Sequence, residues 1–194
     1  MALIFKRIYI GSKRFIFDLL IVLLFIIPYS VCYAQTINNT NDSLVTGHEN
    51  GNIAPDIKLF SPENVEYKLS ELRGKLVLIH FWSSVCSHCK IENPKLVGIY
   101  NNYHDNSFVN GEQFEIFSVS IDVIAADWKK AIERDKMPWK YQVCSRLGWK
   151  SEVVKQYDFH KTPSTFLIDK YGKIIAKNIW GDELSKKLGE LAKK

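Results

Sequence analysis

A nearly unbroken apolar run, Leu76–Trp82, occupies the middle of the chain and predicts a β-strand that is buried on both faces. A short turn of serine and valine follows, and the next segment has the spacing of an amphipathic helix. Apolar and aromatic residues can share one face of that helix: Ile91, Leu96, Ile99, Tyr100 and Tyr103. The pattern therefore predicts a buried strand, a turn and a helix in direct succession.

The rest of the hydrophobic pattern predicts a sheet with helices packed against it. Strands are expected at 57–60, 65–69, 114–122, 140–144, 165–169 and 173–179, and helical segments at 70–74, 125–136, 151–157 and 182–193. Asp182 is placed to cap the final helix. The connections between successive core strands are long enough to hold helices, so those strand pairs should be parallel. We expect an α/β fold with a central mixed sheet, helices on both faces and an N-terminal β-hairpin extension.

Residues 1–34 have the features of a secretory signal peptide. A basic stretch at 6–14 precedes an apolar core at 19–27, and small residues end at Ala34. An uncleaved membrane anchor and lipidation at Cys32 are the alternatives. Because all three deliver the remaining chain outside the cytosol, we expect an exported protein, in the periplasm or on the outer face of the cytoplasmic membrane.

Residues 35–53 are polar and lack periodicity, which predicts a linker before one domain at 54–194. The 194-residue chain has a net charge of +5, but much of this charge belongs to residues 1–34. The rest is nearly balanced in charge, so nothing indicates a nucleic-acid partner.

The sequence Cys86-Ser-His-Cys89 lies between the predicted strand and helix, which is typical of a thioredoxin-like redox motif. At the helix N-terminus, free backbone N–H groups and the helix dipole favour a thiolate at Cys86. Cys89 follows one turn later, close enough to form a small disulfide ring. A structural disulfide and half of a metal site are the alternatives, but a structural zinc site would need a second closely spaced Cys/His pair. The motif predicts redox chemistry by the two cysteines, without a metal or other cofactor.

With these elements placed, the chain resembles the thioredoxin-like superfamily, and within it the TlpA/ResA group of exported, often membrane-tethered thiol-disulfide oxidoreductases. The resemblance runs from about residue 54 to the C-terminus. The matching motifs are Ala54-Pro-Asp56, Leu69-Ser-Glu-Leu-Arg-Gly-Lys75, Phe81-Trp-Ser83, Cys86-x-x-Cys-Lys-x-Glu-x-Pro94, Ser118-Val-Ser-Ile-Asp122, Thr162-Pro163 and Phe166-Leu-Ile-Asp-x-x-Gly172.

The resemblance implies a role for each matching site residue. Cys86 would be the attacking thiol and Cys89 the resolving thiol. Pro163 would have a cis peptide bond and face the disulfide, whereas most X–Pro bonds are trans. Glu92 matches an acidic position of the family and could relay protons or hold His88, which lies four residues before it on the helix. A solvated helix charge is the alternative for Glu92.

Departures from the family pattern affect the expected substrate groove and the direction of the reaction. The groove is expected to include Trp82, Val85 and Thr162, and Val85 stands where the family usually has tryptophan. The dipeptide between the cysteines includes His88, and a histidine there is similar to the strong oxidant DsbA. His80 lies on the buried strand, where it would serve as an acid or base for Cys89 or as a hydrogen-bonded core histidine.

These residues predict an exported enzyme that exchanges disulfides with protein thiols and disulfides, acting as a reductase. The resemblance implies a membrane thiol reductant as electron donor, and apocytochrome c thiols are the family's typical target. The alternatives are an oxidant of the same fold and a copper-binding thioredoxin-like metallochaperone that uses Cys86, Cys89 and His88 or His160. A peroxidase is disfavoured because Ile79 stands where the peroxidase motif needs proline. Cys144 is expected to pack as a small buried hydrophobic residue.

Overall fold

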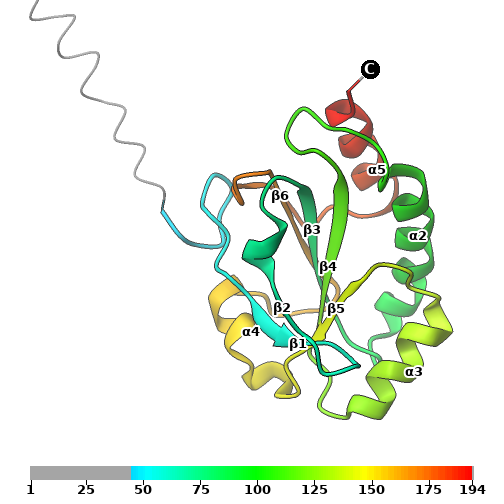
Figure 1. The fold of residues 1–194 in the computed structure, drawn as a ribbon. Helices are drawn as coiled ribbons and strands as arrows, with labels where there is room; N and C mark the ends of the chain where they lie inside the picture. The colour runs from blue at the N-terminus through cyan, green and yellow to red at the C-terminus, as the bar shows by residue number, and fades with distance from the viewer. Residues whose placement is uncertain (1–44, 194) are drawn as a thin grey trace, which may run out of the picture. The chain divides into compact units, whose positions relative to one another are not determined.

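One mixed β-sheet runs through residues 45–193, the part of the chain that the computed structural model describes (Figure 1). Its strands follow the order β2-β1-β5-β4-β3-β6-β7. They are β1 (Lys58–Phe60), β2 (Glu66–Lys68), β3 (Leu76–Trp82), β4 (Phe114–Ser120), β5 (Tyr141–Cys144), β6 (Ser164–Ile168) and β7 (Ile174–Lys177). Each strand coincides with a predicted one to within about two residues. The predicted signal peptide, 1–34, lies outside the described residues.

The helices cover both faces of the sheet, as predicted. The helical elements are η1 (Leu69–Leu72), α2 (Ser87–Tyr103), α3 (Ala125–Asp135), η2 (Gly148–Lys150), α4 (Glu152–Tyr157) and α5 (Gly181–Leu191), of which η1 and η2 are single 3-10 turns. Helices α2, α3 and α5 lie on one side of the sheet, and α4 lies on the other (Figure 1). The fold is the predicted α/β class, with β1 and β2 forming the N-terminal hairpin.

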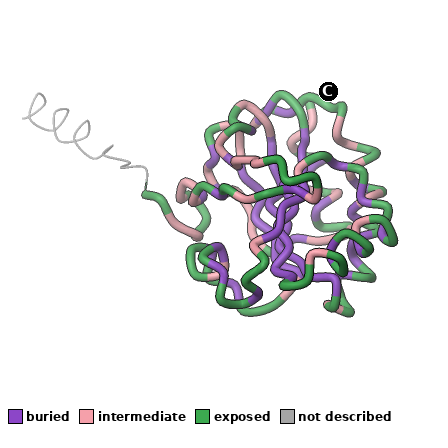
Figure 2. Tube along the Cα trace, turned by 60° about the horizontal axis from the view of Figure 1, so that its bottom comes forward, coloured by how far each residue is buried: buried purple, intermediate pink, exposed green. Residues whose placement is uncertain are grey.

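Strand β3 lies between β4 and β6 in the sheet, and all of its residues are buried. It pairs in parallel with β4, which pairs in parallel with β5, as the long connections predicted. It also pairs with β6, in the antiparallel direction. Figure 2 shows the central strands as one buried stretch inside an exposed shell. This topology brings the carboxyl ends of β3 and β4 and the start of β6 to the same edge of the sheet.

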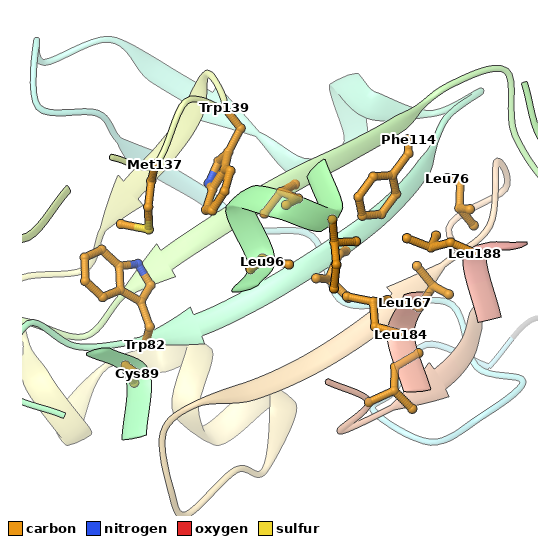
Figure 3. Close-up of a cluster of buried hydrophobic side chains, with 14 of the residues drawn as sticks. Leu76, Trp82, Cys89, Leu96, Phe114, Met137, Trp139, Leu167, Leu184 and Leu188 are labelled. Atoms are coloured by element: carbon orange, nitrogen blue, oxygen red, sulfur yellow. The ribbon is translucent and has the colours of Figure 1, made fainter. Parts of the chain in front are cut away.

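Successive residues of β3 point into two separate apolar layers, because side chains alternate along a strand. The layer between the sheet and helices α2, α3 and α5, which we call the first core, lies beneath the C-x-x-C motif (Figure 3). It includes Leu76, Trp82, Cys89, Leu96, Phe114, Met137, Trp139, Leu167, Leu184 and Leu188. Burying one large apolar side chain contributes about 1.5–3 kcal/mol, so this layer holds α2 firmly to the sheet.

The buried face of α2 differs from the predicted one. Ile91 is 57% exposed, whereas Glu92 and Asn93 are buried beside Leu96 and Ile99. Asn93 is buried although it is polar, because it meets a polar group of a neighbouring helix. The side-chain amide of Asn93 donates a 2.7 Å hydrogen bond to a carboxylate oxygen of Asp135, which ties α2 to α3.

The ordered contacts of the domain begin before residue 54. The backbone N–H of Gly51 donates to the carbonyl of Ile174, and that of Ala54 donates to the carbonyl of Gly172. The described end of the predicted linker is therefore bonded to the β7 region. No helix within residues 45–193 has the length and apolarity that a membrane span requires.

The final helix begins one residue earlier than the sequence predicted. Trp180 is the N-cap of α5, and no side chain caps the helix end there. Asp182 lies in the first turn instead of at the cap. Its negative charge still interacts favourably with the positive end of the helix dipole.

Candidate active site

Cys86 and Cys89 lie at the junction of β3 and α2 and are joined by a disulfide. Cys86 is the N-cap of α2, and its sulfur accepts a 3.0 Å hydrogen bond from the backbone N–H of Cys89. Cys86 is partly exposed, whereas Cys89 is only 1% exposed and belongs to the first core. The first sulfur is therefore accessible to another molecule, and the second is shielded from it.

A buried carboxylate holds the turn that leads from β3 to Cys86. Asp122, just beyond the end of β4, accepts hydrogen bonds from the hydroxyls of Ser83 (3.0 Å), Ser84 (2.7 Å) and Ser120 (2.7 Å). It also accepts one from the backbone N–H of Ser84 at 2.9 Å. The two oxygens of a carboxylate have enough lone pairs to accept all of these hydrogen bonds. The network fixes the turn before the cysteines.

From the sequence, Asp122 belongs to a family motif, but no role in the site was predicted for it. The available signal was its position directly after a buried strand that is parallel to β3. Because parallel strands end at the same edge of a sheet, such a residue falls beside the turn that follows β3.

The peptide bond between Thr162 and Pro163 is cis, as the resemblance implies. The carbonyl oxygen of Thr162 lies 3.2 Å from the sulfur of Cys86. Pro163 is buried directly before β6. Strand β6 runs antiparallel to β3, so the start of β6 lies beside the carboxyl end of β3. This pairing brings the Thr162-Pro163 dipeptide next to Cys86.

His80 is fully buried on β3, and burial lowers its pKa to about 3, so the imidazole is neutral near pH 7. Its Nδ1 lies 3.0 Å from the hydroxyl oxygen of Ser118, which also accepts a 2.8 Å hydrogen bond from the indole N–H of Trp139. Because the indole can only donate, the hydroxyl proton of Ser118 is free for Nδ1. We therefore assign the imidazole proton to Nε2, which has no hydrogen-bond partner among the described residues.

Glu92 is buried, which contradicts the alternative of a solvated helix charge. One of its carboxylate oxygens accepts a 2.8 Å hydrogen bond from the ammonium group of Lys95. Glu92 and His80 line the same cavity, together with Trp180. The cavity measures about 10 Å³, close to the minimum for one water molecule. His88 is exposed, and no described contact joins it to Glu92.

The hollow beside Cys86 differs in part from the expected groove. Val85, which is 78% exposed, and Thr162 line it as predicted. Trp82 does not, because it is fully buried in the first core close to Cys89 (Figure 3). The hollow measures about 350 Å³ and is lined by Ser83, Ser84, Val85, Cys86, Ile121, Asp122, Val123, Ile124, Asp127, Gly148, Trp149 and Thr162.

Sequence reasoning missed the wall of this hollow that Val123, Ile124 and Trp149 form. An apolar side chain in a sequence normally predicts the core, so exposed apolar residues at a site carry no separate signal. These residues line the hollow because the fold places the end of β4 and the η2 turn beside Cys86, and this tertiary arrangement cannot be predicted from local sequence.

The geometry agrees with comparisons to known proteins. Residues 50–177 match the AhpC/TSA family. The chain belongs to the AhpC/TSA family. It is 29% identical over 146 residues to the thiol-disulfide oxidoreductase ResA of Bacillus thuringiensis, which covers 75% of this chain and 78% of that protein.

Solved structures similar to this AhpC/TSA-family chain have the same fold. The thioredoxin domain of a thiol-disulfide oxidoreductase from Bacteroides vulgatus has a TM-score of 0.66 and 35% identity, covering 73% of this chain and 96% of that one. A thiol:disulfide interchange protein from Bacteroides sp. has a TM-score of 0.65 and 36% identity, covering 73% and 89%. The comparisons confirm the predicted thioredoxin-like fold and the predicted enzyme class, a thiol-disulfide oxidoreductase.

Cys144 is the free cysteine among residues 45–193 of this AhpC/TSA-family chain. The Cys144 thiol is buried and donates to the backbone carbonyl of Asp122 at 3.3 Å, and burial raises the pKa of this thiol. It packs as the predicted small buried residue.

Within residues 45–193, no group of three or more His, Cys, Asp or Glu side chains could hold a metal ion.

Proposed function

We propose that the protein is an exported thiol-disulfide reductase that acts on disulfides of other proteins through Cys86 and Cys89. The observation that carries the disulfide-exchange chemistry is the contrast between the two sulfurs. The sulfur of Cys86 is accessible at a helix N-terminus and accepts the N–H of Cys89, whereas the sulfur of Cys89 is buried. A backbone N–H and the helix dipole both stabilise a thiolate at such a position.

In the first step, the Cys86 thiolate attacks one sulfur of a substrate disulfide. The new bond joins Cys86 to that sulfur, the substrate disulfide breaks, and the other substrate sulfur leaves as a thiolate that takes a proton from water. The Thr162 carbonyl, 3.2 Å from the sulfur of Cys86, can accept the hydrogen of the resting thiol. With Pro163 and Val85 it borders the place where the substrate sulfur must arrive.

In the second step, Cys89 loses its proton and its thiolate attacks the sulfur of Cys86. The mixed disulfide breaks, the substrate leaves as a second thiol, and Cys86–Cys89 becomes oxidised by two electrons. We assign the proton of Cys89 to the carboxylate of Glu92, one helical turn after Cys89. His80 does not keep this proton, because burial holds its pKa at about 3. It offers its Nε2–H to the cavity that it shares with Glu92.

Two features support the reductase direction over the oxidant alternative. The buried carboxylate of Asp122 is bonded to the turn that precedes Cys86. A negative charge near Cys86 makes the thiolate form of this cysteine less favourable. The reduced form is then less stabilised, which lowers the reduction potential. His88, in contrast, is exposed to solvent, which screens the effect of its side chain on the Cys86 thiolate.

The cycle needs a dithiol partner that returns two electrons to the Cys86–Cys89 disulfide. For an exported protein we propose a membrane thiol reductant as this donor, at the periplasmic or outer face of the cytoplasmic membrane. The thiols of apocytochrome c are the proposed substrate class. The predicted signal peptide at 1–34 supports the location, and the family likeness supports the partners.

The reduction potential of the Cys86–Cys89 couple, measured in glutathione or dithiothreitol buffers, tests the direction. We expect a value close to that of thioredoxin, about −270 mV, and a value close to that of DsbA, about −120 mV, would instead establish the oxidant. A Cys89→Ser variant should accumulate mixed disulfides with protein substrates, and Cys86→Ser is the matched control that cannot. If neither variant forms them and the wild type reduces no protein disulfide, the proposed function is wrong.

A further inference from the structure

The hollow beside Cys86 has an apolar wall that the two reaction steps leave without a role. Val123 (65% exposed), Ile124 (60%) and Trp149 (51%) present their side chains to solvent there. With Val85 they line the same hollow as the reactive sulfur of Cys86. Contiguous exposed apolar groups of this kind mark an interaction site.

The wall is held in place by contacts on its inner side. The ring of Trp149 packs against Phe159 with their centroids 5.9 Å apart, and Phe159 stacks on Phe81 of β3 at 4.4 Å. Gly148 has φ +59°, and a side chain there would come within 3.3 Å of Val123. The η2 turn can therefore lie this close to the end of β4. The hollow is preformed, which lowers the entropy cost of binding.

The size of the hollow limits what can occupy it. About 350 Å³ is at the lower end of the range for ligand pockets, roughly 300–1,000 Å³. That volume suits one or two side chains of an extended segment. A second hollow shares Ser84, Val85 and Asp127 with the first and is otherwise lined by Lys130, Ala131 and Arg134. The two hollows differ in charge, because cationic side chains line the second one and the lining of the hollow at Cys86 has none.

The occupant follows from the chemistry of the sulfur. A substrate disulfide must reach Cys86, so the chain that flanks the substrate cysteine must lie over the adjoining surface. This inference rests on the proposed reaction with protein disulfides. We propose that the hollow binds an apolar side chain next to the reacting cysteine of the substrate, with Trp149 and Ile124 as the residues that determine this specificity.

The test uses the reduced full-length protein and peptides joined by a single disulfide. The residue beside the peptide cysteine is leucine in one series and serine in the other, placed before or after the cysteine. For the wild type we expect kcat/KM to be about tenfold higher for leucine, the lower end of what one apolar group gains in an enzyme pocket. In Trp149→Ser and Ile124→Ser the preference should fall to about two- or threefold.

Two controls separate a lost hollow from a damaged enzyme. Leu147→Ser removes an apolar side chain that is 60% exposed but does not line the hollow, and it should keep the tenfold preference. Bis(2-hydroxyethyl) disulfide, which has no side chain to bind, should react at the wild-type rate with every variant. Equal rates for both peptide series in the wild type, or an unchanged preference in both wall variants, would overturn the inference while the reductase function stands. If no peptide reacts although the small disulfide does, the function itself has failed.

Discussion

Replacing His80 by asparagine should remove part of the acid sensitivity of the fold between pH 7.5 and pH 5. Burial lowers the pKa of His80 from 6.5 to about 3 in the native protein, with the carboxylate of Asp135 opposing the shift. In the unfolded chain the same imidazole titrates near its ordinary value. Between these two pKa values the unfolded state binds a proton that the native state does not. The neutral His80 therefore does not reduce the free energy of unfolding above about pH 6.5, and this free energy decreases as the pH falls from 6.5 toward 3.

The size of this effect at pH 5 depends on the unfolded state alone, as long as the native pKa stays well below 5. The unfolded imidazole is then about 1.5 pH units below its pKa, and each unit contributes about 1.4 kcal/mol. His80 should therefore reduce the free energy of unfolding by about 2 kcal/mol on going from pH 7.5 to pH 5. No correction for solvent screening is needed, because His80 is fully buried.

Urea denaturation of the oxidised protein at the two pH values measures the effect. Asparagine can keep a hydrogen bond to Ser118, and its own cost in packing appears at both pH values and cancels. The wild type should lose about 2 kcal/mol more than His80→Asn on acidification. His88→Asn, which removes an exposed histidine, is the matched control and should behave as the wild type. An equal loss in wild type and His80→Asn would refute the assignment of a depressed pKa to this histidine.

Other sites give three further predictions. Asp122→Ala leaves the buried N–H of Ser84 and the hydroxyls around it without an acceptor, so it should destabilise the protein by about 3–5 kcal/mol in urea denaturation; a change below about 1 kcal/mol would contradict the network. Leu188→Ala opens a cavity in the first core and should lower the free energy of unfolding by about 2–5 kcal/mol, and a smaller loss would mean that α5 is loosely packed. Cys144 should react with a thiol reagent such as Ellman's reagent only after unfolding, because burial covers the thiol and raises its pKa. Rapid labelling of the native oxidised protein would show that the thiol is accessible and contradict this prediction.

The hydrophobic pattern predicted the elements well because their identity depends on local spacing. Leu76–Trp82 and the strand at 114–122 are long apolar runs, and long runs in a domain of this size must be buried. The C-x-x-C motif was recognisable for the same reason, since its setting between strand and helix is local. The family likeness then implied the cis bond before Pro163, which lies far from the cysteines in sequence.

The errors arose where a partner from another element decides the position of a residue. Ile91 was expected to be buried but is exposed. The helix face that turns toward α3 carries Asn93, whose amide bonds to Asp135 of α3, and Ile91 does not lie on that face. Trp82 was expected at the groove, but the pleat of β3 points it into the first core. Trp149 gave no signal at all, since its place beside Cys86 depends on packing against Phe159.

The order of the strands also constrains when the protein can become active during its synthesis. Cys86 and Thr162 are 76 residues apart in the chain, yet they touch in the finished site. They meet only after β6 has paired with β3, and β6 is made after the whole α3–β5–α4 segment. Contacts between such distant parts of a chain form late, because closing a long loop costs entropy. A nascent chain that has exposed its two cysteines therefore still lacks the opposite wall of the site, and reactivity specific to this enzyme should begin only when the C-terminal strands are in place.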